Sequence, residues 1–192
     1  MDAMRKPGAP GPPPTEAMLH DAALAHLARY AATGAGLTRV LDRRCERWAR
    51  ETATPEAADS LPALRHAVRA VVARLTTAGA VDDAAFAASR ARSLGRAGRS
   101  RRAIAAHLAA RGVTGDTARA ALPDDPEAEL AAALALARRR RLGPFRPPDA
   151  EADRRRELGV LARAGFGQDV AQRALDTDAD TAEALVAALR RG

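Results

Sequence analysis

A recurring helix ending limits what this chain can fold into. The pattern is leucine, three residues, glycine and then an apolar residue, and it occurs at 75–80, 108–113 and 161–166. In each copy leucine would occupy helix position C3, glycine the left-handed C′ position and the apolar residue C″, as in a Schellman ending. Short stretches that end in Ala-Leu follow the latter two copies, at 121–122 and 174–175. The repetition predicts tandem small helical units that stack on their neighbours in an elongated array.

The composition also favours helices. Alanine and leucine dominate, aromatic residues make up 3% of the 192 residues, and long β-branched runs are absent. Such residues have high intrinsic helix propensity. Because large side chains are few, each pair of helices buries a modest apolar area. We therefore predict an all-α chain with thin, extended packing.

Proline, glycine and polar stretches divide the chain into a tail and three units. Residues 1–14 are rich in proline and glycine and lack periodicity, so we predict a disordered tail there. The first three-helix unit covers 15–78 and the second covers 79–123. The third three-helix unit, together with a C-terminal capping helix, covers 124–192.

Apolar spacing and capping residues place the helices within these units. In the first unit we predict helices at 15–30, 38–50 and 61–78, with a polar connection at 52–60. Helices of the second unit should begin at the capping residues Asp82, Ser100 and Thr114. In the third unit we predict a helix that ends in the arginine run, followed by helices at 150–164, 168–175 and 179–190.

A corner between helices opens the second unit. Gly79 suits the left-handed residue that ends a helix, and Asp82 suits the N-cap of the next. Asp83 would favour the positive end of that helix, and Val81 and Phe86 have the spacing of a hydrophobic staple. Because the staple residues flank the aspartates, helix capping explains Asp82 and Asp83 better than a pair of metal-binding carboxylates. We assign structural roles to this set: Gly79, Asp82, Asp83, Phe86, Gly112 and Gly165.

A one-sided run of charge follows the corner. Seven arginines and no acidic residue lie between Ala84 and Gly115, and the whole chain has a net charge of +7. A GC-rich codon bias explains arginine in place of lysine, but it does not explain the clustering without acids. Four consecutive arginines at 138–141 exceed what a helix dipole needs. We predict phosphate or acidic-partner contact for Arg90, Arg92, Arg96, Arg99, Arg101, Arg102, Arg138, Arg139, Arg140 and Arg141.

Sites for catalysis, metals or cofactors are not indicated. Cys45 is the single cysteine, the four histidines are scattered, and no phosphate loop or nucleophile motif occurs. Trp48 could stack on a base, but its spacing from Leu41 and Cys45 favours a place in the core. No apolar run reaches the length of a membrane span. We expect a non-enzymatic, cytoplasmic monomer without cofactor or metal.

The central segment resembles the RecX family, bacterial regulators of the RecA recombinase. The family pattern is G-aromatic-apolar-D-D-x-x-F/Y-A, then arginines, then G-x-x-R-I-x-x-E-L-x-x-K/R-G-I. Here the similar stretch is GAVDDAAFA at 79–87, then Arg90 and Arg92, and then 98–113. Residues 134–175, within the third unit, also resemble the family. Ala80 replaces the usual aromatic residue and His107 the usual acidic one, which makes the central helix more basic.

The resemblance implies both a fold and a function. It implies a curved array of three-helix units that binds RecA and lies along or caps the RecA–DNA filament, where the DNA is single-stranded. It implies suppression of strand exchange, ATP hydrolysis and co-protease activity, and therefore roles in recombination, DNA repair and the SOS response. Two other functions stay open: a general single-stranded nucleic-acid-binding module without a RecA role, and a scaffold for acidic proteins.

Overall fold

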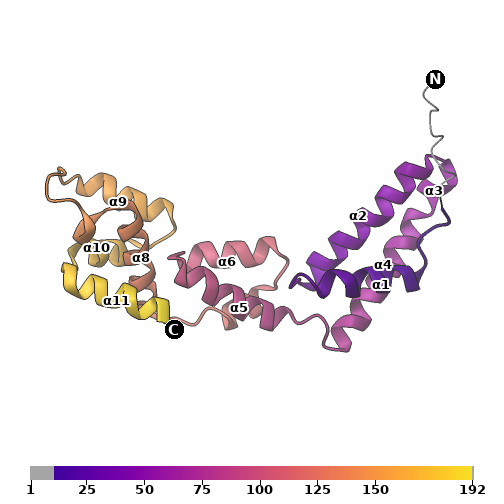
Figure 1. Ribbon diagram of the computed structural model, residues 1–192, viewed down its shortest axis with the longest axis horizontal. Coiled ribbons are helices and arrows are strands. Elements are labelled where there is room, and N and C mark those ends of the chain that lie inside the picture. The colour runs from indigo at the N-terminus through magenta and orange to yellow at the C-terminus, as the bar shows by residue number, and fades with distance from the viewer. Residues whose placement is uncertain (1–10, 192) are drawn as a thin grey trace, which may run out of the picture. The chain divides into compact units, whose positions relative to one another are not determined.

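The computed structural model describes residues 11–191, and these are all-helical (Figure 1). The all-α prediction is therefore confirmed. The chain divides after Asp83 into two compact units. The first contains α1 (Glu16–Leu27), α2 (Gly34–Thr52), α3 (Pro55–Asp59) and α4 (Leu61–Thr77). The second contains α5 (Asp83–Arg96), α6 (Arg101–Ala110), α7 (Gly115–Ala120), α8 (Pro126–Arg140), η1 (Gly143–Phe145), α9 (Arg154–Arg163), α10 (Gln168–Asp176) and α11 (Ala179–Arg191).

Several predicted helix bounds need correction. The first helix ends at Leu27 rather than residue 30, and α2 begins at Gly34 because Thr33 caps it, four residues before the predicted start. The predicted polar connection at 52–60 contains α3, which the Thr54 side chain caps. In the third predicted unit, α9 begins at Arg154 rather than residue 150, because Asp153 is its cap. The predicted unit boundaries at 78/79 and 123/124 stay a prediction.

The predicted tail of residues 1–14 is described only in part. Residues 1–10 lie outside the described residues. Pro14 is buried, and the Gly11 carbonyl accepts a hydrogen bond of 2.9 Å from Trp48 Nε1. Pro14 and the Gly11 carbonyl therefore contact the first unit, and the disordered tail stays a prediction. Trp48 packs against the core of the first unit, as its helical spacing predicts.

The core of the first unit lies mainly between α2 and α4. Leu37, Leu41 and Cys45 of α2 are buried, and so is the whole predicted inward set of α4: Leu64, Val68, Val71, Val72 and Leu75. A further contact joins the last residue of this unit to the start of α2, because the Asp83 carboxylate accepts a hydrogen bond of 2.8 Å from the Gly34 amide. Asp83 therefore adds negative charge at the start of α2, where amides lack helical partners.

Two further cores lie in the second compact unit. One involves α5, α6 and α7 and contains Ala87, Ile104, Leu108 and Val113. The other surrounds α8, whose residues from Leu130 to Ala137 are all buried, and α9, α10 and α11 lie around this helix (Figure 1). A helix that is apolar on every side needs neighbours on every side. Its many alanines allow those neighbours to approach closely.

The predicted Schellman endings are present. The amides of Ala80, Val113 and Phe166 donate to the leucine carbonyls five residues earlier, at 2.9, 3.1 and 3.2 Å. The intervening glycines have positive φ angles of 72°, 85° and 93°. Two further endings have the same hydrogen bonds, from Arg99 to Leu94 with Gly98 at C′ and from Leu142 to Ala137 with Arg141 at C′. Leu94 and Gly98 have the same leucine–glycine spacing as the first three endings, so this ending could have been predicted from the sequence.

The predicted staple pairs residues of different cores. Val81 is buried in the core of the first unit. Phe86 is half-buried and packs against Ala87, Ile104 and their neighbours. Val81 and Phe86 thus belong to different clusters, and a staple contact between them stays a prediction.

Candidate partner-binding surface

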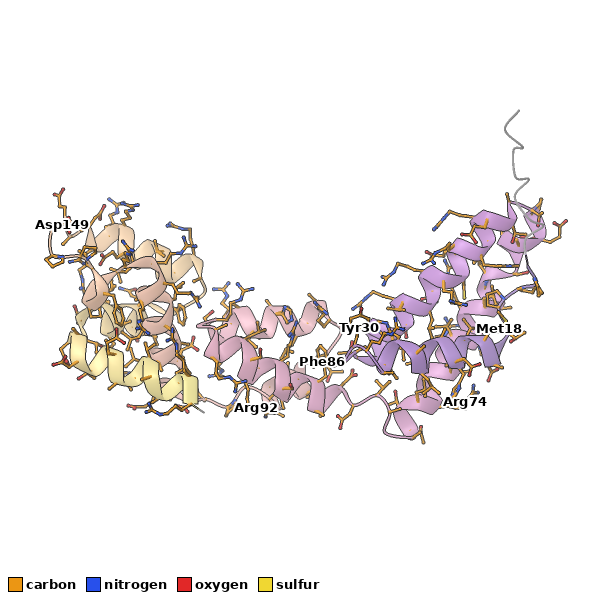
Figure 2. The ribbon with its side chains drawn as sticks, viewed as in Figure 1. Met18, Tyr30, Arg74, Phe86, Arg92 and Asp149 are labelled. Atoms are coloured by element: carbon orange, nitrogen blue, oxygen red, sulfur yellow. The ribbon has the colours of Figure 1, made fainter. Side chains whose placement is uncertain are left out.

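The central arginines lie on three short stretches. Arg90, Arg92 and Arg96 belong to α5, Arg99 to the loop after it, and Arg101 and Arg102 to the first turn of α6. All except Arg101 are exposed. Phe86 lies at the start of α5 and Arg92 further along the same helix (Figure 2). Helix and loop together therefore present a group of positive charges to solvent.

The start of α6 tolerates arginines because acidic groups surround it. The Ser100 hydroxyl accepts a hydrogen bond from the Ala103 amide, and the Glu129 carboxylate accepts from the Arg101 amide at 2.9 and 3.2 Å. The Arg101 guanidinium pairs with Asp124. Burial raises the pKa of Glu129, while the amide and charge of Arg101 oppose that rise. Arg101 is thus held within the protein, whereas Arg102 is exposed.

Two grooves adjoin these arginines. The larger, about 810 Å³, has apolar residues of α6 and α7 on its floor and Arg101, Arg102 and Arg119 beside acidic Asp124 at its edge. The smaller, about 290 Å³, has Arg92, Arg96 and Arg99 at its edge. Both lie within the second compact unit.

His107 has a polar atom without a hydrogen-bond partner among residues 11–191. Its Nε2 is buried, and the residue lies within the electrostatic reach of Arg90, Arg99 and Arg111. Burial lowers the pKa of His107, and the three arginines lower it further, Arg111 most. The imidazole is therefore mainly neutral at pH 7 and adds little charge to this surface.

The four arginines at 138–141 differ in their contacts. Arg138 forms an ion pair of 3.2 Å with Glu183 of α11, and the Arg139 guanidinium donates to the Ala97 carbonyl. Arg140 is exposed, and Arg141 takes the left-handed position after α8, with a φ of 56°. Arg138 and Arg139 hold neighbouring elements in place, so Arg140 and Arg141 are the better candidates for contact with a partner.

Sequence reasoning missed the acidic residues that anchor this surface. Glu129 and Glu183 lie 28 residues and 45 residues from the arginines that they bind, Arg101 and Arg138. A third missed pair is Arg146 with the buried Glu157, joined by hydrogen bonds of 2.9 and 2.7 Å, which raise the pKa of Arg146. Local spacing carries no signal for partners this distant.

The described residues contain neither a metal site nor a membrane-spanning helix. Residues 11–191 contain no group of His, Cys, Asp and Glu arranged to hold a metal ion. None of the helices in this range is long and apolar enough to cross a membrane.

Comparison with known proteins decides the family. A family model described as RecX, second three-helix domain, matches residues 82–122. Regulatory protein RecX of Myxococcus xanthus is 40% identical over 164 residues, which cover 83% of this chain and 85% of that protein. The chain belongs to the RecX family.

Other RecX proteins match over shorter lengths. Those of Thermobifida fusca and Agrobacterium fabrum are 44% and 34% identical, over 55% and 56% of this chain and 58% of each relative. A crystal structure of regulatory protein RecX has a TM-score of 0.62 and 24% identity, over 84% of this chain and 72% of that one. At this identity the structural likeness shows the fold. The relatives are named regulatory proteins, and none of these names describes an enzyme.

Proposed function

We propose that this protein binds RecA and the RecA–DNA filament and modulates RecA, mainly by inhibiting its recombinase, ATPase and co-protease activities. The observation that carries the proposal is the match to a RecX regulatory protein over most of both chains. Regulation of RecA places the protein in the cytoplasm, in homologous recombination, DNA repair and the SOS response. The proposed partner surface is the group of exposed arginines on α5, the α5–α6 loop and α6.

The geometry favours two of these arginines, Arg99 and Arg102, as the residues that would contact the partner. Arg99 and Arg102 are exposed, and no carboxylate pairs with either in the part of the chain that the structure describes. Arginine binds phosphate and carboxylate groups through two parallel hydrogen bonds. These two side chains can therefore reach filament DNA or an acidic RecA surface without breaking an internal ion pair.

The test is RecA's DNA-dependent ATPase in the presence of sub-stoichiometric protein. We expect inhibition by the wild type and clear weakening of that inhibition by Arg99→Glu with Arg102→Glu. The control is Arg43→Glu with Arg47→Glu, which changes two exposed arginines of α2 and alters the net charge equally. If the wild type leaves the ATPase unchanged, a RecA role is wrong.

The second candidate is a general single-stranded nucleic-acid-binding module, which the exposed arginines also favour. It requires binding to an oligonucleotide without RecA, with a logarithmic salt slope of about 0.7 per phosphate neutralised. Measuring this binding by fluorescence anisotropy for the same variants separates the two functions. Variants that lose RecA inhibition but keep DNA affinity would place these arginines against RecA itself. Loss of both would indicate contact with DNA.

A further inference from the structure

The smaller groove of the second compact unit has an apolar floor. It holds about 290 Å³, near the lower end of volumes for small-ligand pockets. Ala91, Ile104 and Ala132 form the floor and are each at least 90% buried, while Leu122 and Leu189 form apolar walls. A space of this kind takes one large apolar side chain rather than a folded element.

The edge of the groove is basic. Arg92, Arg96 and Arg99 line it and are exposed. Two carboxylates also line it, but backbone amides engage both of them. Asp125 accepts from the amides of Glu127 and Ala128 at 3.0 Å, and Glu129 accepts from the Arg101 amide. With Arg101, the lining contains four arginines and these two carboxylates, so its net charge is positive.

The lining argues against a nucleotide base. Proteins that hold single strands stack the bases on aromatic side chains. Among the described residues that line this groove, none is aromatic. An aliphatic floor under an arginine edge instead matches a peptide that inserts an apolar side chain and carries acids on either side, because an anchor in a pocket with a charged rim is a common interface arrangement.

We propose that the groove between α5, the α5–α6 loop and α8 binds an acidic peptide segment through one large apolar anchor residue. The anchor lies on Ala91, Ile104 and Ala132, and the flanking carboxylates pair with Arg92, Arg96 and Arg99. The site deepens the proposed function, because it names the chemistry of a protein segment that a RecA regulator would hold. Peptide binding itself is independent of RecA.

Gly95 offers a way to close the groove without disturbing the fold. It lines the groove within α5, and a Cβ added there would meet no atom within 4 Å. Leucine also has a higher helix propensity than glycine. Gly95→Leu should therefore place its side chain in the groove while leaving every arginine and the thermal unfolding midpoint of the protein intact or slightly raised.

The experiment titrates the full-length protein with a fluorescein-labelled heptapeptide, Glu-Asp-Glu-Phe-Asp-Glu-Asp, by fluorescence anisotropy. We expect saturable binding, weakened about tenfold or more when serine replaces the phenylalanine. Gly95→Leu should weaken binding about tenfold or more, as should Arg92→Glu with Arg99→Glu. The control pair Arg43→Glu with Arg47→Glu should bind as the wild type does.

Three outcomes would overturn the site. The first is that the wild type binds the serine peptide as tightly as the phenylalanine peptide. The second is that Gly95→Leu binds the phenylalanine peptide as tightly as the wild type does. The third is that Gly95→Leu loses affinity for a thymidine oligonucleotide of matched charge but keeps its affinity for the peptide. The last outcome would assign the groove to a nucleic acid. RecA ATPase inhibition is scored separately, so a failed RecA role with intact peptide binding leaves this site standing.

Discussion

Ser100 joins the start of α6 to the end of α9. Its hydroxyl accepts from the Ala103 amide and donates to the Ala164 carbonyl at 2.7 Å, and the residue is fully buried. Gly165 permits this contact, because a Cβ there would lie 2.6 Å from the Ser100 hydroxyl oxygen. One small side chain therefore satisfies two helix ends that are 64 residues apart in sequence.

Ser100→Ala should lower the free energy of unfolding by about 2 kcal/mol. About half of this is the lost N-cap and the remainder is the unpaired Ala164 carbonyl. Thr114→Ala, which removes an exposed cap with no distant partner, should cost about 1 kcal/mol or less. Urea denaturation followed by circular dichroism measures both. Equal losses in the two variants would show that the Ala164 bond contributes nothing.

His107 should make stability depend on pH. Because its pKa is lower in the folded protein than the ordinary 6.5, protonation favours the unfolded state. The stability that neutral His107 provides is complete above about pH 6.5 and is lost as pH falls through the lower folded value. Wild type should lose more stability between pH 7 and 5 than His107→Gln, as measured by urea denaturation at each pH. Parallel curves would contradict this.

At the level of helices, polar groups distant in sequence complete the helix starts. Thr33 caps α2 locally, and Asp83 adds a carboxylate to the same helix start from 49 residues away. Glu129 does the same for α6, which begins with two arginines that a helix dipole disfavours. The starts of α2 and α6 thus each depend on a local cap and a distant acid.

Asp83→Ala should lower the free energy of unfolding of the first unit by about 1–2 kcal/mol, since a charged acceptor at a helix start is lost. Asp83→Asn keeps an acceptor and loses only the charge, so it should cost about 0.5 kcal/mol. Hydrogen exchange of the α2 amides, compared between the two variants, measures the difference. If neither variant raises exchange near Gly34, the contact does not stabilise α2.

Contacts at these helix starts could be predicted from the sequence only where the two partners lie a few residues apart. The caps Thr15, Ser100 and Thr114 were predictable because each hydroxyl bonds an amide three residues on. The Asp83–Gly34, Arg101–Glu129 and Arg138–Glu183 contacts were not, because a carboxylate that binds an amide or guanidinium tens of residues away leaves no local pattern. The arginines of the candidate surface were visible in sequence, but which of them are held internally became clear only once their partners were placed.

At the scale of the molecule, the chain forms separate hydrophobic cores. The core of α2 and α4 and the core around α8 have no residue in common. The two compact units that contain them meet in sequence at Asp83 and Ala84. Damage to one core should therefore stay within its own unit.

Leu134→Ala tests this separation. Leu134 is fully buried in α8, so its truncation should cost about 3–4 kcal/mol through lost burial and a cavity. Native-state hydrogen exchange should show lost protection in α8, α10 and α11 and unchanged protection in α2 and α4. Val68→Ala should show the reverse pattern. Uniform loss across both units would mean that they unfold as one.

The hydrogen bond between Asp83 and Gly34 has a consequence for synthesis on the ribosome. A growing chain that has released α1 to α4 already contains the apolar residues of α2 and α4, yet the start of α2 still lacks its distant carboxylate. Domains generally fold as units in the order of synthesis. The first unit should therefore gain its full stability only once Asp83, its last residue and the first residue of α5, has emerged.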